Sequence, residues 1–362
     1  MLPEVSVLMP VYNGEKHIES AVFSILNQSF DDLELIIIDD GSTDNTSQII
    51  KKIKDKRIRF FSNGSNRGLP YTRNRGLKLC RGRYIAFMDS DDISHEDRLK
   101  IQLKHFYKHP HIDIISSTKL NIENKNISVK KLMTENFSMQ NKIKYFLRKS
   151  LHNVYETPNS NIMLLYRCMI VNPSSMVKKS FITKNNLSYR DQYFVAQDYS
   201  FWMDCMLKNA KFKILQYPLV YYRTGDGYEN ITNMSRKFKS KERKLLISSI
   251  RTRGLEETNL LSDFRDLTVF NKFFQEKKFI VNENNVKILK KTLHKLKINN
   301  KKNEVFPVSN FNYVAQLNWV NQVVNTTNLN KKKKIIYLLM GRWFSKNPKA
   351  IAYTIFQILK LK

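Results

Sequence analysis

The sequence predicts an α/β fold: a mostly parallel sheet with helices on both faces, followed by a mainly helical C-terminal region. In the first hundred residues, short apolar runs alternate with amphipathic stretches, a pattern typical of a parallel sheet covered on both sides. After about residue 235 the chain is rich in Lys, Asn and Leu, with apolar residues at helical spacing. With 42% hydrophobic residues over 362 positions, it is long enough to bury a large core.

Individual strands can be placed from β-branched and aromatic runs that are bounded by turn residues. Four such runs are Val5–Met9, Leu33–Ile38, Ile58–Phe61 and Tyr84–Met88. Amphipathic spacing predicts helices at about 15–28, 43–54, 70–80 and 94–109. Ser42 or Thr43 is expected to cap the second of these helices. Later strands are predicted near Ile112–Ser116, from Met176 onward and at Phe212–Gln216, with QDYSFWMDCML as a helix before the last.

The charge balance narrows the class of partners. The formal net charge of +30 favours nucleic acid, an anionic membrane surface or a phosphorylated substrate. Cys80, Cys168 and Cys205 form no C-x-x-C pair, so neither zinc binding nor redox chemistry is indicated. We expect no signal peptide, and no window of about 18 apolar residues predicts a membrane-spanning helix. These features predict a cytoplasmic protein.

Carboxylates follow the predicted strands where those strands end. Residues 10–13 (PVYN) follow the first strand, residues 39–41 (DDG) the second and residues 89–92 (DSDD) the fourth. Ligands of open parallel sheets bind beyond the carboxyl ends of the strands. So many like charges at one edge cost free energy unless a cation or hydrogen-bond donors compensate them. The sequence therefore predicts a binding site at this edge.

The pattern Asp89-Ser90-Asp91-Asp92 indicates a divalent metal beside a nucleotide diphosphate. Mg²⁺ and Mn²⁺ take oxygen ligands from one or two carboxylates, and phosphates complete the shell. An isolated Asp-x-Asp is more often a solvated turn, but this one follows the apolar strand YIAFM and faces DDGSTD. No glycine-rich phosphate loop is present. Arg73 and Arg75 are therefore the candidates to neutralise the diphosphate, the alternative being ordinary solvated helix arginines.

Five segments in order resemble the motifs of the family-2 glycosyltransferases. They are VSVLMPVYNGEKHIESAVFSILNQSF, LELIIIDDGSTDNT, NRGLPYTRNRGL, RYIAFMDSDD and QDYSFWMD. The resemblance covers about residues 4–225 and implies the GT-A fold, the Rossmann-like fold of nucleotide-diphospho-sugar transferases. It implies a catalytic domain at 1–235, with a donor-binding half at about 1–116 and an acceptor-side half at about 117–235. Residues 236–362 are expected to form the helical region.

The resemblance also implies roles for individual residues. The uridine part of the donor is expected to contact Pro10, Tyr12, Asp40 and Arg73. Asp89 is expected near the ribose and the metal, which is Mn²⁺ or Mg²⁺, and Asp91 as the main metal ligand. Asp198, in the segment usually written E-D-x-x-F/Y, is the expected catalytic base.

Two positions depart from the family pattern. Gln197 replaces the Glu that usually precedes the base, which removes a neighbouring charge but leaves the base in place. The alternative role for Asp198 is a helix N-cap. The segment VYYRTGDGYENIT lacks the His that many relatives carry after the Tyr-Arg pair. Asp226 or water is expected to take its place at the metal, unless the metal is held more loosely.

The expected function is the inverting transfer of a hexose or N-acetylhexosamine from a UDP-sugar to an oligosaccharide or glycolipid acceptor. The glycan is expected to be a surface one: lipooligosaccharide, lipopolysaccharide O-antigen or capsule. The tail at 331–362 holds nine Lys or Arg and no acidic residue among its aromatic residues. Such a tail predicts peripheral association with the cytoplasmic face of the inner membrane, the alternative being a packed helix with a solvated basic face.

A metal-dependent nucleic-acid-binding protein or nuclease is the alternative from another class. The net charge of +30 supports it. However, aromatic and basic residues do not interleave in an RNA-binding pattern, and an acidic edge without metal repels phosphates. We therefore expect no nucleic-acid partner.

Overall fold

The structure, a computed structural model, describes residues 2–123, 159–224, 240–275, 283–325 and 331–340, together with 354, 355 and 357. Contacts divide the chain into two compact units. The first consists of residues 1–146 and 170–243, and the second of residues 147–169 and 244–362. Asp226 and most of the tail after 340 lie outside the described residues.

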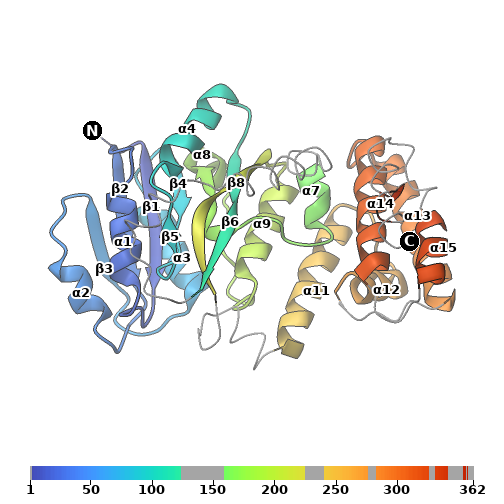
Figure 1. Ribbon diagram of the computed structural model, residues 1–362, viewed down its shortest axis with the longest axis horizontal. Helices are drawn as coiled ribbons and strands as arrows, with labels where there is room; N and C mark the ends of the chain where they lie inside the picture. Colours follow the sequence, from blue (N-terminus) through green and yellow to red (C-terminus); the bar gives the residue numbers. More distant parts are fainter. Residues whose placement is uncertain are drawn as a thin grey trace. The chain divides into compact units, whose positions relative to one another are not determined.

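The described part of the first unit contains an eight-stranded sheet in the order β3-β2-β1-β4-β7-β6-β8-β5 (Figure 1). The strands are β1 Val5–Val11, β2 Leu33–Asp39, β3 Ile58–Ser62, β4 Tyr84–Phe87, β5 Ile93–Ser94, β6 Ile114–Glu123, β7 Met176–Lys178 and β8 Phe212–Thr224. Strands β3, β2, β1 and β4 are parallel neighbours, as are β6 and β8. Strand β7 pairs antiparallel with β4 and β6, and β5 with β8. The predicted mostly parallel sheet is therefore confirmed, with antiparallel pairings in its second half.

Helices cover both faces of this sheet. They are α1 Ile18–Leu26, α2 Thr46–Lys52, α3 Leu69–Leu79, α4 Arg98–Lys108, α8 Lys179–Lys184 and α9 Gln197–Leu207. Val7 and Met9 of β1 belong to a core cluster with residues of α1, α2 and α4. Leu8, whose side chain points to the other face, lies against Gly76 of α3. A Cβ on Gly76 would lie 2.2 Å from the Leu8 Cδ1, so glycine lets α3 approach β1 closely.

Two local predictions differ from the structure. The residue before α2 is Asn45 and makes no side-chain cap bond, so capping by Ser42 or Thr43 is wrong. The Ser42 hydroxyl instead donates to Asp39 Oδ1 within the preceding turn. Strands β6 and β8 run on to Glu123 and Thr224, well beyond the predicted Ser116 and Gln216. Their parallel pairing passes a bulge near Pro218, a residue that interrupts strand patterns.

The described part of the second unit is helical, which confirms the predicted helical C-terminal region. Its helices are α7 Asn159–Leu164, α11 Ser240–Glu257, α12 Phe264–Gln275, α13 Glu283–Asn303, α14 Val308–Asn325 and α15 Lys331–Met340. Tyr166 packs against Phe270 and Phe274 of α12 with ring centroids 5.3 and 4.8 Å apart. Among the described residues, no helix combines the length and the apolarity that crossing a membrane requires.

Candidate active site

The loops after β1 and β2 are joined by hydrogen bonds at the carboxyl end of the sheet. Asn13, at φ 50°, donates its backbone N–H to the Ser42 hydroxyl at 2.9 Å and accepts the Thr43 N–H at 2.9 Å. The Gly14 N–H donates to the Thr46 hydroxyl at 2.8 Å. Because parallel strands end at the same edge, these bonds fix both loops beside the segment that follows β4.

Pro10 and Tyr12, which the sequence predicts to contact the nucleotide-sugar donor, lie at this edge of the sheet. Pro10 is buried near the end of β1, opposite Ile38 of β2. Tyr12 lies just past the strand and is 47% exposed. An exposed aromatic ring beside a sheet edge offers a flat apolar surface to a ligand.

Asp40 organises the chain that leads into α3. Its carboxylate is buried and accepts hydrogen bonds from Asn63 Nδ2 at 2.7 Å, the Arg67 N–H at 3.0 Å and the Gly68 N–H at 2.9 Å. Gly68, at φ 88°, immediately precedes the helix. Asp40 thus fixes the start of the helix that carries Arg73.

The structure brings three carboxylates together after β4. Asp89, Asp91 and Asp92 each offer an oxygen, and these oxygens all lie within 4.8 Å of one another. Asp92 is 1% exposed; its Oδ1 accepts the Arg223 N–H at 3.0 Å, whereas its buried Oδ2 has no hydrogen-bond partner within the described part of the chain. Burial raises the pKa of Asp92 well above its ordinary value, and the charges of Asp91 and Asp89 raise it further. A divalent cation would offset this repulsion.

Arg73 joins α3 to the acidic cluster. Its Nη2 donates to Asp89 Oδ1 at 3.0 Å, and the Arg73 side chain is 4% exposed. Burial raises the pKa of Asp89 to about 6, and Asp91 and Asp198 raise it as well, whereas the guanidinium of Arg73 lowers it. The Arg73 Nε and Nη1 atoms are buried and have no hydrogen-bond partner among the residues that the structure describes. Part of the positive charge of Arg73 is therefore left without a hydrogen bond next to the carboxylates.

Asp198 lies in the first turn of α9, and its charge acts on both members of this ion pair. Burial lowers the pKa of Arg73, but Tyr189, Asp89 and Asp198 together raise it above its ordinary value. The residue that precedes α9 is Ala196, at φ 64° and without a side-chain cap bond. The Asp198 Oδ1 instead accepts the Tyr199 N–H at 2.8 Å. The structure thus places Asp198 inside the helix rather than at the N-cap, and beside the acidic cluster.

The chain is similar to a family of known enzymes. A model described as Glycosyl transferase family 2 matches residues 6–172. The chain is 33% identical over 225 residues to an uncharacterised glycosyltransferase of Methanocaldococcus jannaschii, covering 61% of this chain and 71% of that protein. This chain belongs to glycosyltransferase family 2. Membership confirms the predicted enzyme class, a glycosyltransferase of glycan biosynthesis, and gives no support to the nucleic-acid alternative.

Two further similarities concern sequence and fold. The glycosyltransferase is 31% identical over 228 residues to WfaP of Escherichia coli, named UDP-Glc:alpha-D-GlcNAc-diphosphoundecaprenol beta-1,3-glucosyltransferase, covering 62% of this chain and 78% of WfaP. Its fold is similar to that of S. aureus TarS 1–349, solved in complex with UDP-GlcNAc, with a TM-score of 0.53 at 18% identity. That alignment covers 99% of this chain and 90% of TarS 1–349. The GT-A fold prediction is confirmed.

The sequence analysis missed Arg98, a buried cation of the glycosyltransferase beneath the acidic cluster. Arg98 is fully buried; its Nη2 donates to the carbonyl of Phe87 at 2.7 Å and of Ser175 at 3.3 Å. Burial lowers the pKa of Arg98 to about 9, while Asp89 and Asp92 partly offset that effect. A basic first residue in α4 opposes the helix dipole. That mismatch is the sequence signal that could have identified Arg98.

Arg75, the other predicted phosphate candidate, is engaged elsewhere. Its Nη1 donates to the Ser62 carbonyl at 2.7 Å and to Asn63 Oδ1 at 2.6 Å. These contacts tie α3 to the end of β3. Arg73 and Arg75 therefore have separate surroundings although they lie two positions apart.

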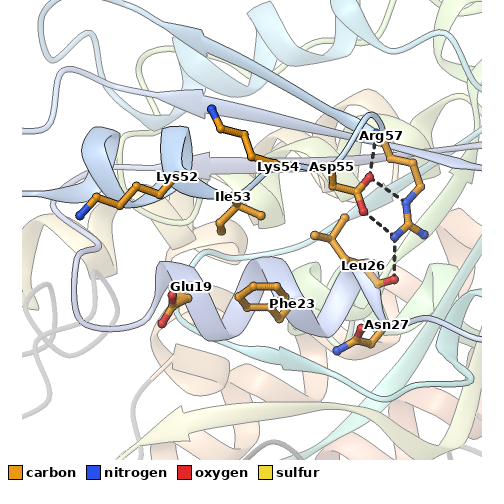
Figure 2. A pocket seen from close by; sticks show the side chains of 9 residues that line it. All are labelled: Glu19, Phe23, Leu26, Asn27, Lys52, Ile53, Lys54, Asp55 and Arg57. Carbon is orange, nitrogen blue, oxygen red and sulfur yellow. Dashed lines mark hydrogen bonds and ion pairs between the residues drawn. The ribbon is translucent and has the colours of Figure 1, made fainter.

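A surface pocket of about 420 Å³ lies between α1 and the segment after α2 (Figure 2). Phe23, Leu26 and Ile53 give it an apolar surface, and Arg57 is hydrogen-bonded to Asp55 at its edge (Figure 2). None of the predicted site residues lines it. The pocket is therefore separate from the candidate active site.

Proposed function

We propose that this glycosyltransferase moves a hexose or N-acetylhexosamine from a UDP-sugar to a surface glycan acceptor, with inversion at the anomeric carbon. The observation that carries the proposal is the ion pair of Arg73 and Asp89, whose carboxyl pKa is raised by burial and by the charges of both Asp91 and Asp198. This arrangement joins a diphosphate site to a separate base. The proposed catalytic part is residues 1–235, with a donor-binding half at about 1–116.

The donor is proposed to lie along the carboxyl edge of β1, β2 and β4. Pro10, Tyr12, Asp40 and Arg73 are proposed to contact its uridine part, and Asp89 its ribose. The names of WfaP, a UDP-Glc enzyme, and of TarS, solved with UDP-GlcNAc, support a UDP-sugar. The free donors of Arg73 supply positive charge there, since the loop after β1 has no glycine-rich phosphate motif.

Asp91 and Asp89 are the proposed ligands of a divalent metal, Mn²⁺ or Mg²⁺. Carboxylate oxygens within 4.8 Å of one another suit a hard cation, and the unpartnered Oδ2 of Asp92 marks uncompensated negative charge beside them. When bound, such an ion offsets negative charge on the departing diphosphate. Asp226, the suggested replacement for the relatives' His, lies outside the described residues.

Asp198 is the proposed general base. In the proposed reaction its carboxylate takes the proton of an acceptor hydroxyl while the hydroxyl oxygen forms a bond to the anomeric carbon. The bond from that carbon to the diphosphate oxygen breaks on the opposite face, and UDP leaves with the electron pair. Arg73, which is paired with Asp89, is proposed to stabilise the negative charge that develops on the departing UDP.

The acceptor is proposed to be an oligosaccharide or glycolipid of lipooligosaccharide, O-antigen or capsule synthesis. WfaP, whose name gives a diphosphoundecaprenol acceptor, supports a lipid-linked substrate.

Residues 331–340 begin with four lysines and form α15. We propose that the basic tail at 331–362 holds the enzyme at the cytoplasmic face of the inner membrane. The full-length protein should float with anionic liposomes, and deletion of residues 331–362 should abolish this flotation. If the truncated protein floats as before, the proposed membrane role of the tail is wrong.

The direct test of the proposed activity is a donor screen. The enzyme is incubated with Mn²⁺ and a panel of UDP-sugars, and released UDP is measured with and without a lipid-linked acceptor. UDP release with one or two members of the panel supports the proposal. GDP-mannose is tested separately, with released GDP measured; GDP release from it, with no UDP release from any UDP-sugar, would contradict the proposed donor class.

A further inference from the structure

Tyr189 contacts two helices with different proposed roles: α3 carries Arg73, which is proposed to bind the donor, and α9 carries Asp198, the proposed base. The Asn74 Nδ2 of α3 donates to the Tyr189 carbonyl at 2.7 Å, and the Tyr189 N–H donates to Asn74 Oδ1 at 2.7 Å. The two residues lie 115 positions apart in sequence. This reciprocal pair fixes the backbone of residue 189 against the helix that carries Arg73.

The ring of Tyr189 lies between a cation and an aromatic residue of α9. The guanidinium carbon of Arg73 lies over the Tyr189 ring, 5.3 Å from its centroid. The same ring stacks on Phe201, with centroids 4.4 Å apart and planes 9° apart. Phe201 is three positions after Asp198, one turn along α9. One side chain therefore contacts both the arginine of the acidic cluster and the helix of the proposed base.

The hydroxyl of Tyr189 takes no part in these contacts. Tyr189 is 2% exposed, and its Oη is buried without a hydrogen-bond partner in the described residues. Among the described residues, the Arg73 side chain forms an ion pair with Asp89, and its buried Nε and Nη1 form no hydrogen bond. A single hydrogen bond does not by itself set the plane of a guanidinium group, whereas a flat aromatic ring against its face does.

We propose that Tyr189 is a positioning residue: its ring holds the Arg73 guanidinium in the plane in which Nη2 pairs with Asp89. The inference rests on the proposed donor-binding role of Arg73. Asn74 holds the Tyr189 backbone, and Phe201 supports the ring from the side of α9. Through the side chain of Tyr189, the position of Arg73 is thereby linked to that of α9, the helix that carries Asp198.

The test is a double-mutant cycle on the Kd for UDP in the presence of Mn²⁺, measured by calorimetry on the full chain. Tyr189→Leu removes the flat ring and is expected to weaken UDP binding about fivefold, in the range of a partly buried cation–π contact. Tyr189→Phe keeps the ring and is expected to bind within about twofold of the parent. In the Arg73→Met background, Tyr189→Leu is expected to add nothing, because its effect acts through Arg73.

Arg190→Met is the matched control within the same segment. Arg190 donates from Nε and Nη2 to Asp204 of α9 at 2.9 and 3.1 Å. This variant is expected to lower the Tm without changing the Kd for UDP. If Tyr189→Leu does not fold, Asn74→Ala replaces it, and a weakening of UDP binding by about twofold or more is expected.

The outcomes separate the two proposals. If Arg73→Met weakens UDP binding but neither Tyr189→Leu nor Asn74→Ala does, the positioning role is wrong and the proposed function stands. Effects of Tyr189→Leu and Arg73→Met that add in the double variant also overturn the positioning role. If Arg73→Met leaves the Kd unchanged, the donor role of Arg73 fails, and the inference fails with it.

Discussion

The Nη2 of Arg73 lies 3.0 Å from Oδ1 of Asp89, and this ion pair is the point where α3 meets the acidic cluster. The Arg73 side chain is 4% exposed and that of Asp89 29% exposed. The cation is thus shielded from water while its partner faces the open side of the site. Asp89 is therefore the member of the pair that a metal ion can reach from the open side of the site.

Replacing Arg73 is expected to affect donor binding more than replacing Arg75. Arg73→Met should weaken UDP binding about tenfold or more, because charge-assisted bonds to a phosphate or carboxylate contribute about 1.5–3 kcal/mol each. Arg75→Met removes bonds to the Ser62 carbonyl and Asn63 and a ring contact with Phe61, all around the end of β3, so the Kd for UDP should change by less than about threefold. Calorimetric titration of UDP in Mn²⁺ checks both. Equal effects from the two variants would contradict the separate surroundings described for them.

Divalent metal is expected to stabilise the protein, and more so at pH 7.5 than at pH 5. The folded-state pKa of Asp89 is about 6 against an ordinary 3.8, and that of Asp92 is also raised. The folded protein thus binds these protons more tightly than the unfolded chain, and without metal it loses stability as the pH rises from about 4 to about 6. Above that range Mn²⁺ compensates the charge without competing with protons.

The measurement is thermal unfolding with Mn²⁺ or EDTA at both pH values. A ligand that binds only the folded state, at a concentration of 100 times its Kd, increases the free energy of unfolding by about 2.7 kcal/mol. Such an increase raises the Tm by several degrees. Asp91→Asn should abolish the increase. A metal-induced increase that is larger at pH 5, or is retained in Asp91→Asn, would show that the ion binds elsewhere.

Arg98 is expected to be required for stability because it is a buried cation beneath two carboxylates. Arg98→Met removes a buried positive charge that interacts with Asp89 and Asp92, and it removes the donor to two carbonyls, so it should cost about 3–5 kcal/mol. Mn²⁺ should restore part of this loss by replacing the positive charge. The free energy of unfolding is measured by denaturant titration of the parent and the variant, with and without Mn²⁺. A variant as stable as the parent in EDTA contradicts the charge-compensation role.

Glu34 is expected to stabilise the fold above its ordinary pKa. Burial would raise the Glu34 pKa, but bonds from Ser6 Oγ at 2.6 Å, the Arg81 N–H at 2.7 Å and Arg59 Nη1 at 2.6 Å outweigh it and lower the pKa below 4.5. The contribution is present above pH 4.5 and is lost as the pH falls through the lower folded-state pKa. Glu34→Gln should cost about 2 kcal/mol at pH 7.

Urea unfolding at several pH values measures this effect. The difference between parent and Glu34→Gln should shrink as the pH falls below 4.5, the ordinary pKa of Glu34. A constant difference across that range means that packing rather than charge explains the loss. Glu19→Gln, on the exposed side of α1, serves as the control and should change neither value.

The strand ends could be predicted from sequence because each apolar run stops at a turn residue. Strands β1 and β2 are buried along all seven of their residues, and such runs leave a clear boundary. The long β6 and β8 could not be bounded in this way, because their residues are not buried continuously. Lys119 and Leu120, for example, are exposed within β6.

The carboxylates of the site could be predicted from sequence, whereas its buried cations could not. Asp89 and Asp91 follow a strand directly, so strand order alone brings them to the edge. Arg98 and Tyr189 reach the site through tertiary packing, which no local pattern encodes. The capping prediction at Ser42 was wrong because the hydroxyl bonds to a carboxylate of the same turn.

The separation of Asp198 from donor binding is the central claim, and one pair of measurements on Asp198→Asn tests it most directly. The amide keeps the shape of the side chain but cannot take a proton. With the donor identified by the screen, UDP release during transfer should fall by about 10² to 10⁴-fold, while the Kd for UDP in Mn²⁺ should stay within about threefold. Transfer at the parent's rate contradicts the assignment of Asp198 as the base.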